Sequence, residues 1–101
     1  MKKVFICSPL KGNHKENIKK AKEYSRFAVK KGYIPITPHI YFTQFLNDKI
    51  KREREMALKM NLELLDLCDE LWIFGDRITE GMHKEISKWC RERSLRSIKT
   101  F

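Results

Sequence analysis

The sequence lacks any long hydrophobic run, and no stretch approaches the roughly 20 apolar residues that a membrane-spanning helix needs. The apolar run from Val4 to Cys7 is broken at once by Pro9 and Lys11, so it lacks the hydrophobic region of a signal peptide. Linkers, low-complexity segments and internal repeats are also missing. We therefore expect a single domain over residues 1–101, in the cytoplasm and with no membrane partner.

Cysteine is scarce and shows no ligand spacing. The three cysteines, Cys7, Cys68 and Cys90, form no CxxC or Cys/His cluster, which argues against a disulfide framework and a zinc site. Their apolar surroundings predict buried core thiols in a reducing compartment. A P-loop and a GxGxxG motif are absent too, which disfavours a nucleoside triphosphatase or a dinucleotide fold. We expect no metal and no cofactor.

Positive charge is the strongest compositional feature. Lys and Arg number 22 against 13 Asp and Glu, a net charge of +9 that favours anionic partners such as nucleotides. The basic residues are spread along the chain and match no nucleic-acid module. A solvated basic surface is the preferred interpretation, so a nucleic-acid partner is not expected. A nucleic-acid-binding module stays as an alternative hypothesis that only the charge supports.

Hydrophobic periodicity predicts alternating strands and helices. Strands are expected at 4–7, 33–37, 71–74 and 97–101, the first of them fully buried, with Pro35 marking an edge or a strand end. Helices are expected over 15–31, 49–68 and 80–93, and a short helix or lid begins at Pro38-His39. This order indicates βαβ units and a parallel α/β sheet.

Ligands of open parallel sheets bind where the strands end. The first predicted strand is followed by Ser8, Pro9, Leu10 and Gly12, and the second by Pro38-His39. The loop after the third strand contributes four further candidates: Asp76, Arg77, Thr79 and Gly81. Hydroxyl, basic and glycine residues before a helix N-terminus suit phosphate or ribose recognition. Arg77 is the candidate for a phosphate, and Asp76 with Arg77 could instead be only a loop and a helix cap.

One carboxylate falls on an apolar helix face. Glu85 lies on the stripe formed by Met82, Ile86, Trp89 and Cys90, and Asn61 is placed similarly in the preceding helix. Burying a carboxylate is costly unless it is paired or used, and burial would raise its pKa. Two polar groups on apolar faces suggest a shared site. The alternative is that Glu85 lies at the stripe's margin and pairs with a surface Lys or Arg.

The chain resembles the nucleoside 2-deoxyribosyltransferase superfamily, and within it a group of short bacterial and phage proteins. The similarity extends over most of the chain and is most specific in Thr79-x-Gly81-x-x-x-Glu85. The other matching segments are Phe5 to Leu10, Asn17 with Ala21, Gly32 to Pro35, Pro38-His39 and Asn61-Leu62 to Cys68-Asp69. The resemblance implies a Rossmann-like or flavodoxin-like three-layer sandwich with a parallel sheet of four to five strands. It also implies a homo-oligomer, a dimer or larger, whose neighbouring subunits complete the sites.

The same resemblance implies glycosyl chemistry at C1′ of a nucleoside or nucleoside 5′-monophosphate. Glu85 would be the nucleophile of an N-glycosidase or deoxyribosyltransferase, with a covalent deoxyribosyl intermediate. Thr79 would match the hydroxyl near the phosphate or sugar, and the Ser8 to Gly12 loop would offer backbone N–H groups to the same region.

Two departures from the family pattern keep a second hypothesis open. Asn61 stands where the family has an Asp, and an amide cannot serve as a general acid. The Tyr that the family has in the first strand is replaced locally by Val4-Phe5. His39, Asp69 or His83 could supply a proton instead, and His39 is the preferred candidate. The alternative is a non-catalytic protein of the same fold that binds or sequesters a nucleotide.

Overall fold

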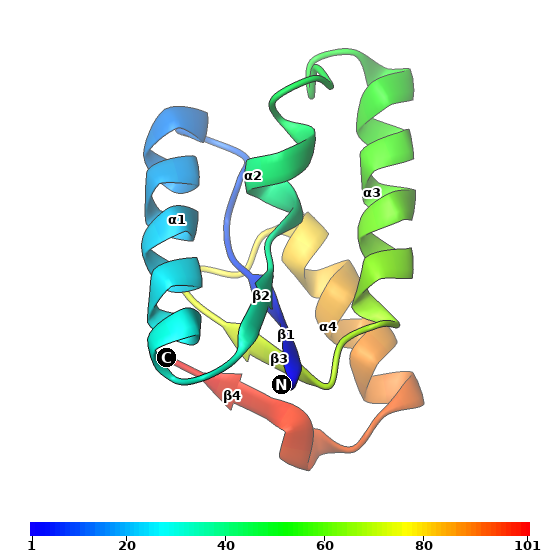
Figure 1. Ribbon diagram of the computed structural model, residues 1–101. Helices are drawn as coiled ribbons and strands as arrows, with labels where there is room; N and C mark the ends of the chain where they lie inside the picture. The colour runs from blue at the N-terminus through cyan, green and yellow to red at the C-terminus, as the bar shows by residue number, and fades with distance from the viewer.

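The computed structural model describes residues 1–101 and is built on one parallel sheet (Figure 1). Its four strands run in the order β2-β1-β3-β4 and all pair in parallel. Strand β1 spans Lys3–Cys7, β2 Ile34–Ile36, β3 Glu70–Ile73 and β4 Ile98–Thr100. This is the strand order of flavodoxin-like folds, and it confirms the predicted α/β class and the position of Pro35 on an edge strand.

Helices cover both faces of the sheet, so the predicted three-layer arrangement is also confirmed (Figure 1). Helix α1 (His14–Lys30) packs on one face, and α3 (Lys51–Leu65) and α4 (Glu80–Glu92) lie side by side on the other. The short helix α2 (Pro38–Phe42) follows β2 where a short helix or lid was predicted. A 3₁₀ turn at Leu95–Ser97 leads into β4.

The alternation of side chains along β1 divides the core into two halves. Val4 and Ile6 pack with Trp72 beneath α1, whereas Phe5 and Cys7 pack with residues of α3 and α4. These four residues of β1 are at most 1% exposed, which explains why they form a continuous apolar run.

Two sequence predictions about α3 and α4 are wrong. Cys90 is exposed rather than buried, because α4 turns its Glu85 and Trp89 side to the core and leaves Cys90 facing outward. Helix α3 ends at Leu65 rather than at Cys68, because the chain must turn there to enter β3. Cys7 and Cys68 are buried as predicted.

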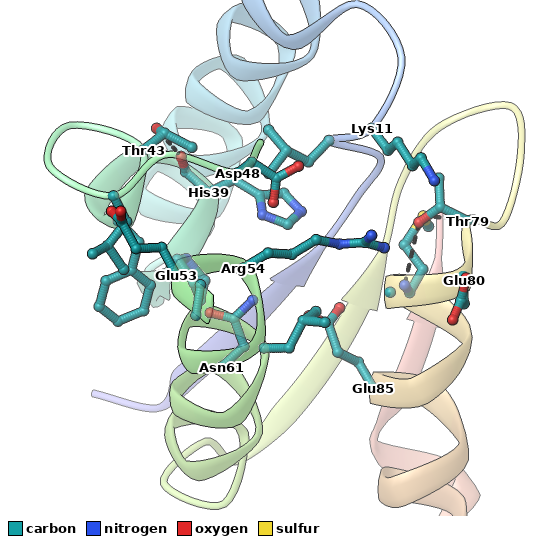
Figure 2. A pocket seen from close by; sticks show the side chains of 18 residues that line it. Lys11, His39, Thr43, Asp48, Glu53, Arg54, Asn61, Thr79, Glu80 and Glu85 are labelled. Atoms are coloured by element: carbon teal, nitrogen blue, oxygen red, sulfur yellow. Dashed lines mark hydrogen bonds between the residues drawn. The ribbon is translucent and has the colours of Figure 1, made fainter. Parts of the chain in front are cut away.

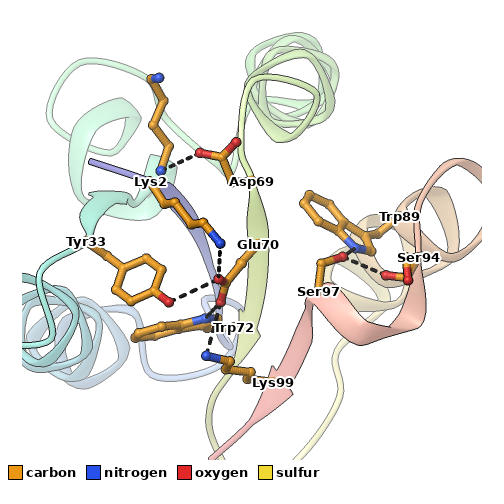
Figure 3. Close-up of polar contacts among 10 residues, drawn as sticks. Lys2, Tyr33, Asp69, Glu70, Trp72, Trp89, Ser94, Ser97 and Lys99 are labelled. Carbon is orange, nitrogen blue, oxygen red and sulfur yellow. Dashed lines mark hydrogen bonds and ion pairs between the residues drawn. The ribbon is translucent and has the colours of Figure 1, made fainter.

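A polar cluster closes the end of the sheet where the strands begin (Figure 3). Glu70 accepts hydrogen bonds from Tyr33 Oη at 3.0 Å and Trp72 Nε1 at 2.8 Å. Lys99 Nζ lies 3.4 Å from the same carboxylate, and Lys2 Nζ lies 3.9 Å from it. Burial acts to raise the pKa of Glu70, but these hydrogen bonds and Lys99 outweigh it and lower the pKa. The cluster fastens together all four strands and leaves the opposite end free for ligand loops.

Two glycines let those loops approach each other closely. A Cβ at Gly75 would lie 2.8 Å from Pro9 Cδ, and its φ of +105° suits only glycine. Gly12, at φ +111°, makes room for the Arg77 guanidinium, whose Nη2 donates to the Lys11 carbonyl at 2.8 Å. The loops after β1 and β3 are therefore held against each other. None of the helices has the length and apolar character needed to cross a membrane.

Candidate functional site

A pocket opens where β1 and β3 end, between α2, α3 and the N-terminus of α4 (Figure 2). This is the edge at which open parallel sheets bind their ligands. The residues that line it come from four separate segments: Leu10, Lys11, Pro38, His39, Phe42, Thr43, Leu46, Asp48, Glu53, Arg54, Ala57, Leu58, Asn61, Thr79, Glu80, Gly81, Met82 and Glu85. Six of the eleven site residues predicted from the sequence are among these, namely Leu10, His39, Asn61, Thr79, Gly81 and Glu85.

Glu85 is buried at the bottom of this pocket. It is 3% exposed, it forms no ion pair, and its Oε1 has no hydrogen-bond partner. The alternative of a marginal Glu85 paired with a surface cation is therefore wrong. Burial raises the pKa of Glu85 to about 8, and a hydrogen bond with Cys7 opposes that rise. A carboxyl left unpaired in an apolar setting costs stability, so it is a candidate for function.

Asn61 reaches the pocket from α3. It is 5% exposed, and its Oδ1 is also buried without a partner. Figure 2 shows Asn61 and Glu85 pointing toward one another from the two helices. The structure thus brings together the two polar groups that the sequence placed on apolar helix faces. One oxygen of each side chain has no partner in the protein, which is uncommon for buried polar atoms.

His39 lies in the wall of the pocket on α2. Its Nε2 is 2.8 Å from the Ser8 carbonyl oxygen, and because a carbonyl only accepts, this nitrogen carries the ring proton. Burial lowers the pKa of His39, with the Ser8 hydrogen bond acting in the opposite direction. A neutral ring bonded in this way can accept a hydrogen bond through Nδ1, but it has no second proton to give. The contact ties α2 to the end of β1.

The first turn of α4 forms the opposite wall. Thr79 caps the helix, its Oγ1 accepting from Met82 N at 3.3 Å, so its hydroxyl proton is still available to a ligand. A Cβ at Gly81 would make only ordinary contacts, 3.9 Å from Leu58 Cδ2 and 4.0 Å from Thr79 Oγ1. Packing does not require glycine there. Because Gly81 has no side chain, the backbone at the N-terminus of α4 is open to the pocket.

The remaining five predicted residues lie outside this pocket. Pro9, Asp76 and Arg77 line a separate hollow on the α1 side of the sheet. Ser8 is buried with an unpartnered Oγ, and Gly12 is exposed beside Arg77; neither lines either hollow. Arg77 forms an ion pair with Asp76 at 3.8 Å and holds the Lys11 carbonyl. Its observed contacts therefore fix the loop.

Two cations of the pocket were not among the sequence predictions. Arg54 extends from α3 across the pocket (Figure 2), and Lys11 projects from the loop after β1. Neither forms an ion pair with a carboxylate. The sequence signal that could have identified Arg54 is its spacing in α3. It shares one helix face with Ala57, Leu58 and Asn61.

The other proposed proton donors lie elsewhere. Asp69 accepts a hydrogen bond from Lys3 N at 2.8 Å, at the end of the sheet opposite the pocket. His83 is exposed on α4, where its Nδ1 lies 3.4 Å from Ser87 Oγ. No group of three or more His, Cys, Asp or Glu side chains is placed to hold a metal ion. What the pocket does offer is a buried carboxyl, an amide and two unpaired cations.

The fold is shared with a 2-deoxyribosyltransferase from the psychrotolerant bacterium Bacillus psychrosaccharolyticus, with a TM-score of 0.65 and 18% sequence identity. The match covers 85% of this chain and 63% of the other, so the chain corresponds to less than two thirds of that enzyme's length. No curated protein matches the chain. A family model does match, over residues 2–99. The chain belongs to the family described as Domain of unknown function (DUF7768).

Proposed function

We propose that this protein cleaves the N-glycosidic bond of a nucleoside or nucleoside 5′-monophosphate, with Glu85 as the nucleophile. The observation that carries the proposal is the buried, unpaired carboxyl of Glu85 at the bottom of the pocket. A buried carboxyl oxygen that has no partner in the protein is poised to meet a ligand atom. The shared fold of the 2-deoxyribosyltransferase supports the same chemistry.

The reaction has two displacements at C1′. In the first, a Glu85 carboxylate oxygen attacks C1′, the C1′–N bond breaks, and the base leaves with the bonding electrons and takes up a proton. In the second, water attacks C1′, loses a proton and frees the Glu85 carboxylate; a second base attacking instead gives transfer. Because the pKa of Glu85 is about 8, Glu85 must lose a proton before it attacks.

The two unpaired cations favour a phosphorylated substrate. Arg54 and Lys11 line the pocket above Glu85 and Asn61 without carboxylate partners (Figure 2). A guanidinium binds phosphate oxygens in pairs, and a helix N-terminus adds further attraction for an anion. A 5′-phosphate bound by Arg54 would leave the sugar deeper in the pocket, near Glu85.

The second candidate is a nucleotide-binding protein without catalysis, and Asn61 is the observation that favours it. Asn61 cannot donate a proton to the leaving base as an acid would, and His39 has no proton to spare. Glu85 argues against this second candidate. A buried carboxyl weakens the binding of an anion, so a protein that only binds nucleotides has no use for it.

We also propose a homo-oligomer in the cytoplasm. Tyr41 and Phe45, beside the pocket, are 61% and 57% exposed, and Met56 on α3 is 50% exposed. The Tyr41 and Phe45 rings lie together, with centroids 5.1 Å apart, and exposed apolar side chains that gather in this way are typical of a surface covered by another subunit. All three cysteines are free, as a reducing compartment would keep them. Light scattering should give at least a dimer, and a Tyr41→Ser, Phe45→Ser double variant should be monomeric.

One assay separates the two functions. The protein is incubated with a panel of nucleosides, deoxynucleosides and their 5′-monophosphates, and free base is followed by chromatography, with Glu85→Ala as the control. Release that disappears in Glu85→Ala supports the glycosidase. Tight ligand binding without release, unaffected by Glu85→Ala, supports the binder and overturns the enzyme.

A further inference from the structure

The outer side of α1 carries a row of basic side chains. Five of them follow one another at intervals of four, three, four and four residues: Lys15, Lys19, Lys22, Arg26 and Lys30. These intervals keep the side chains on one face of the helix. All five are exposed, whereas the buried residues of α1 lie on the side that packs on the sheet. We call these five residues the basic face of α1.

No carboxylate neutralises the basic face. None of its members forms an ion pair with an Asp or Glu side chain, and Glu16 and Glu23 lie beside the row without pairing to it. Helix α1 holds six Lys and Arg residues against two Glu, so it supplies four of the nine net positive charges. Like charges four residues apart destabilise a helix, and a bound polyanion would remove that cost.

The basic face is long and uncovered. Helix α1 lies along one side of the molecule, and no other element covers its outer side (Figure 1). From Lys15 to Lys30 the face extends about 22 Å, at a rise of about 1.5 Å per residue. Lys15, Lys19 and Lys22 border a hollow at the N-terminal end of this row. A row of this length suits a linear polyanion better than a single small anion.

A membrane surface fits this face less well than nucleic acid does. A helix that lies on a bilayer turns an apolar face to the lipid. The apolar side of α1 is already used inside the protein, where Phe27 and Ala28 pack with Trp72. Val29 is the only large apolar side chain that α1 exposes.

Among nucleic acids, duplex DNA fits best. Proteins that hold single strands stack the bases on exposed aromatic rings. Both aromatic rings of α1 pack instead on aromatic residues of the core, Tyr24 on Phe74 and Phe27 on Trp72. The major groove of B-form DNA admits an α-helix, whereas that of A-form RNA is deep and narrow.

We propose that the basic face of α1 binds the phosphate backbone of duplex DNA without sequence preference. Its ammonium and guanidinium groups pair with phosphates and release the condensed counterions. Such contacts fix the protein on the duplex but read no base. The cations resemble solvated surface along the sequence, and the helix gathers them on one side. The proposal does not rest on the glycosidase, because the pocket lies on the other side of the sheet.

The test is fluorescence anisotropy of two labelled DNA duplexes of unrelated sequence, titrated with protein at NaCl concentrations from about 50 to 200 mM. We expect both duplexes to bind equally. The logarithm of the binding constant should fall against the logarithm of salt with a slope of about −4 to −5, because each neutralised phosphate contributes about −0.9. Absence of binding at the lowest salt, or a strong preference for one duplex, overturns the proposal.

A matched pair of triple variants locates the binding surface. The first removes three charges of the basic face: Lys15→Gln, Lys19→Gln and Lys22→Gln. Its salt slope should flatten by about 3, and its affinity at low salt should fall by about tenfold or more. The control removes three exposed, unpaired cations from α3 and the turn before it: Lys49→Gln, Arg52→Gln and Lys59→Gln. It should keep the wild-type slope, and equal losses in the two triples overturn the proposal.

Further arms keep the test decisive. If the first triple variant does not fold, Arg26→Gln takes its place and should flatten the slope by about 1, and an unchanged slope overturns the proposal. Single-stranded DNA, duplex RNA and phosphatidylserine vesicles are titrated at the same salt. Each should bind more weakly than duplex DNA. Equal or tighter binding to any of them overturns the assignment of duplex DNA as the partner.

Discussion

Asn61 on α3 faces Glu85 on α4 across the pocket floor, and each holds a buried oxygen that no protein group satisfies (Figure 2). Two neighbouring unsatisfied atoms are hard to explain by packing, because each costs on the order of 1–3 kcal/mol. A ligand hydroxyl can donate to Asn61 Oδ1 and, while the Glu85 carboxyl is protonated, accept a hydrogen bond from Glu85. The relationship makes the pair, rather than either residue alone, the centre of the site.

Glu85 should make the protein less stable as pH rises. Its pKa is about 8 in the folded protein, against an ordinary value of 4.5. Between these values the unfolded chain has released its proton and the folded protein has not, so stability falls across this window and levels off above it. Relative to wild type, Glu85→Gln should gain about 2–4 kcal/mol between pH 5 and pH 9. Urea unfolding of both proteins at the two pH values measures this; a constant difference contradicts a buried Glu85.

Base release should follow the same ionisation. Only the carboxylate can attack C1′, so kcat/KM is expected to rise with pH and to level off above about 8, the pKa of Glu85 in the free protein. The profile is measured by chromatography of free base from pH 5 to 10. A profile that is flat from pH 5 to 8 would show that Glu85 is not the group that must ionise.

Restoring an acid beside Glu85 should speed the reaction. In Asn61→Asp two buried carboxyls would share a proton near neutral pH, and the protonated one could assist the leaving base. We expect base release at pH 7 to rise by about 100-fold, the lower end of the effect typical of general acids. Asn61→Ala is the control and should not accelerate release. An Asn61→Asp variant slower than Asn61→Ala would count against the assignment.

Arg54 should distinguish phosphorylated from unphosphorylated substrates. In Arg54→Ala the KM for 5′-monophosphates should rise by about 10- to 100-fold, the cost of losing one charged hydrogen-bonding partner, with little change for nucleosides. Arg52→Ala is the matched control, since Arg52 is exposed and does not line the pocket. Equal effects of the two substitutions, or equal losses for both substrate types, would exclude a phosphate contact at Arg54.

Periodicity and turn residues were sufficient to predict the sheet and its flanking helices. They placed Glu85 on an apolar helix stripe but left open whether it faces the core or lies at the margin of the stripe. They could not predict whether a residue at the margin of an apolar helix stripe is buried or exposed. Cys90 was therefore wrongly predicted to be buried, whereas its neighbour Trp89 was placed correctly. Arg54 was missed because, in a chain with many basic residues, one Arg is most simply interpreted as a solvated surface residue. Only the packing of α2 and α4 around α3 shows that it lines a pocket. Arg77 was expected near the ligand, but its loop bends toward α1 at Gly75 and takes the side chain with it.

The role of His39 shows the same limit. Its position after β2 was predicted correctly, and it lies in the pocket wall. Its protonation depends on the Ser8 carbonyl, which is distant in sequence and meets it only through the pairing of β1 with β2. Contacts of this kind decide what a residue can do, and local sequence does not contain them.

The central claim is that Glu85 forms a bond to C1′. The most direct measurement is mass spectrometry of protein quenched in acid during turnover of a monophosphate or nucleoside that releases base, followed by peptide mapping. We predict a pentosyl or phosphopentosyl adduct on the peptide that contains Glu85, absent from Glu85→Gln together with base release. Release of base by Glu85→Gln at the wild-type rate, with no adduct on Glu85 in either protein, would contradict the account.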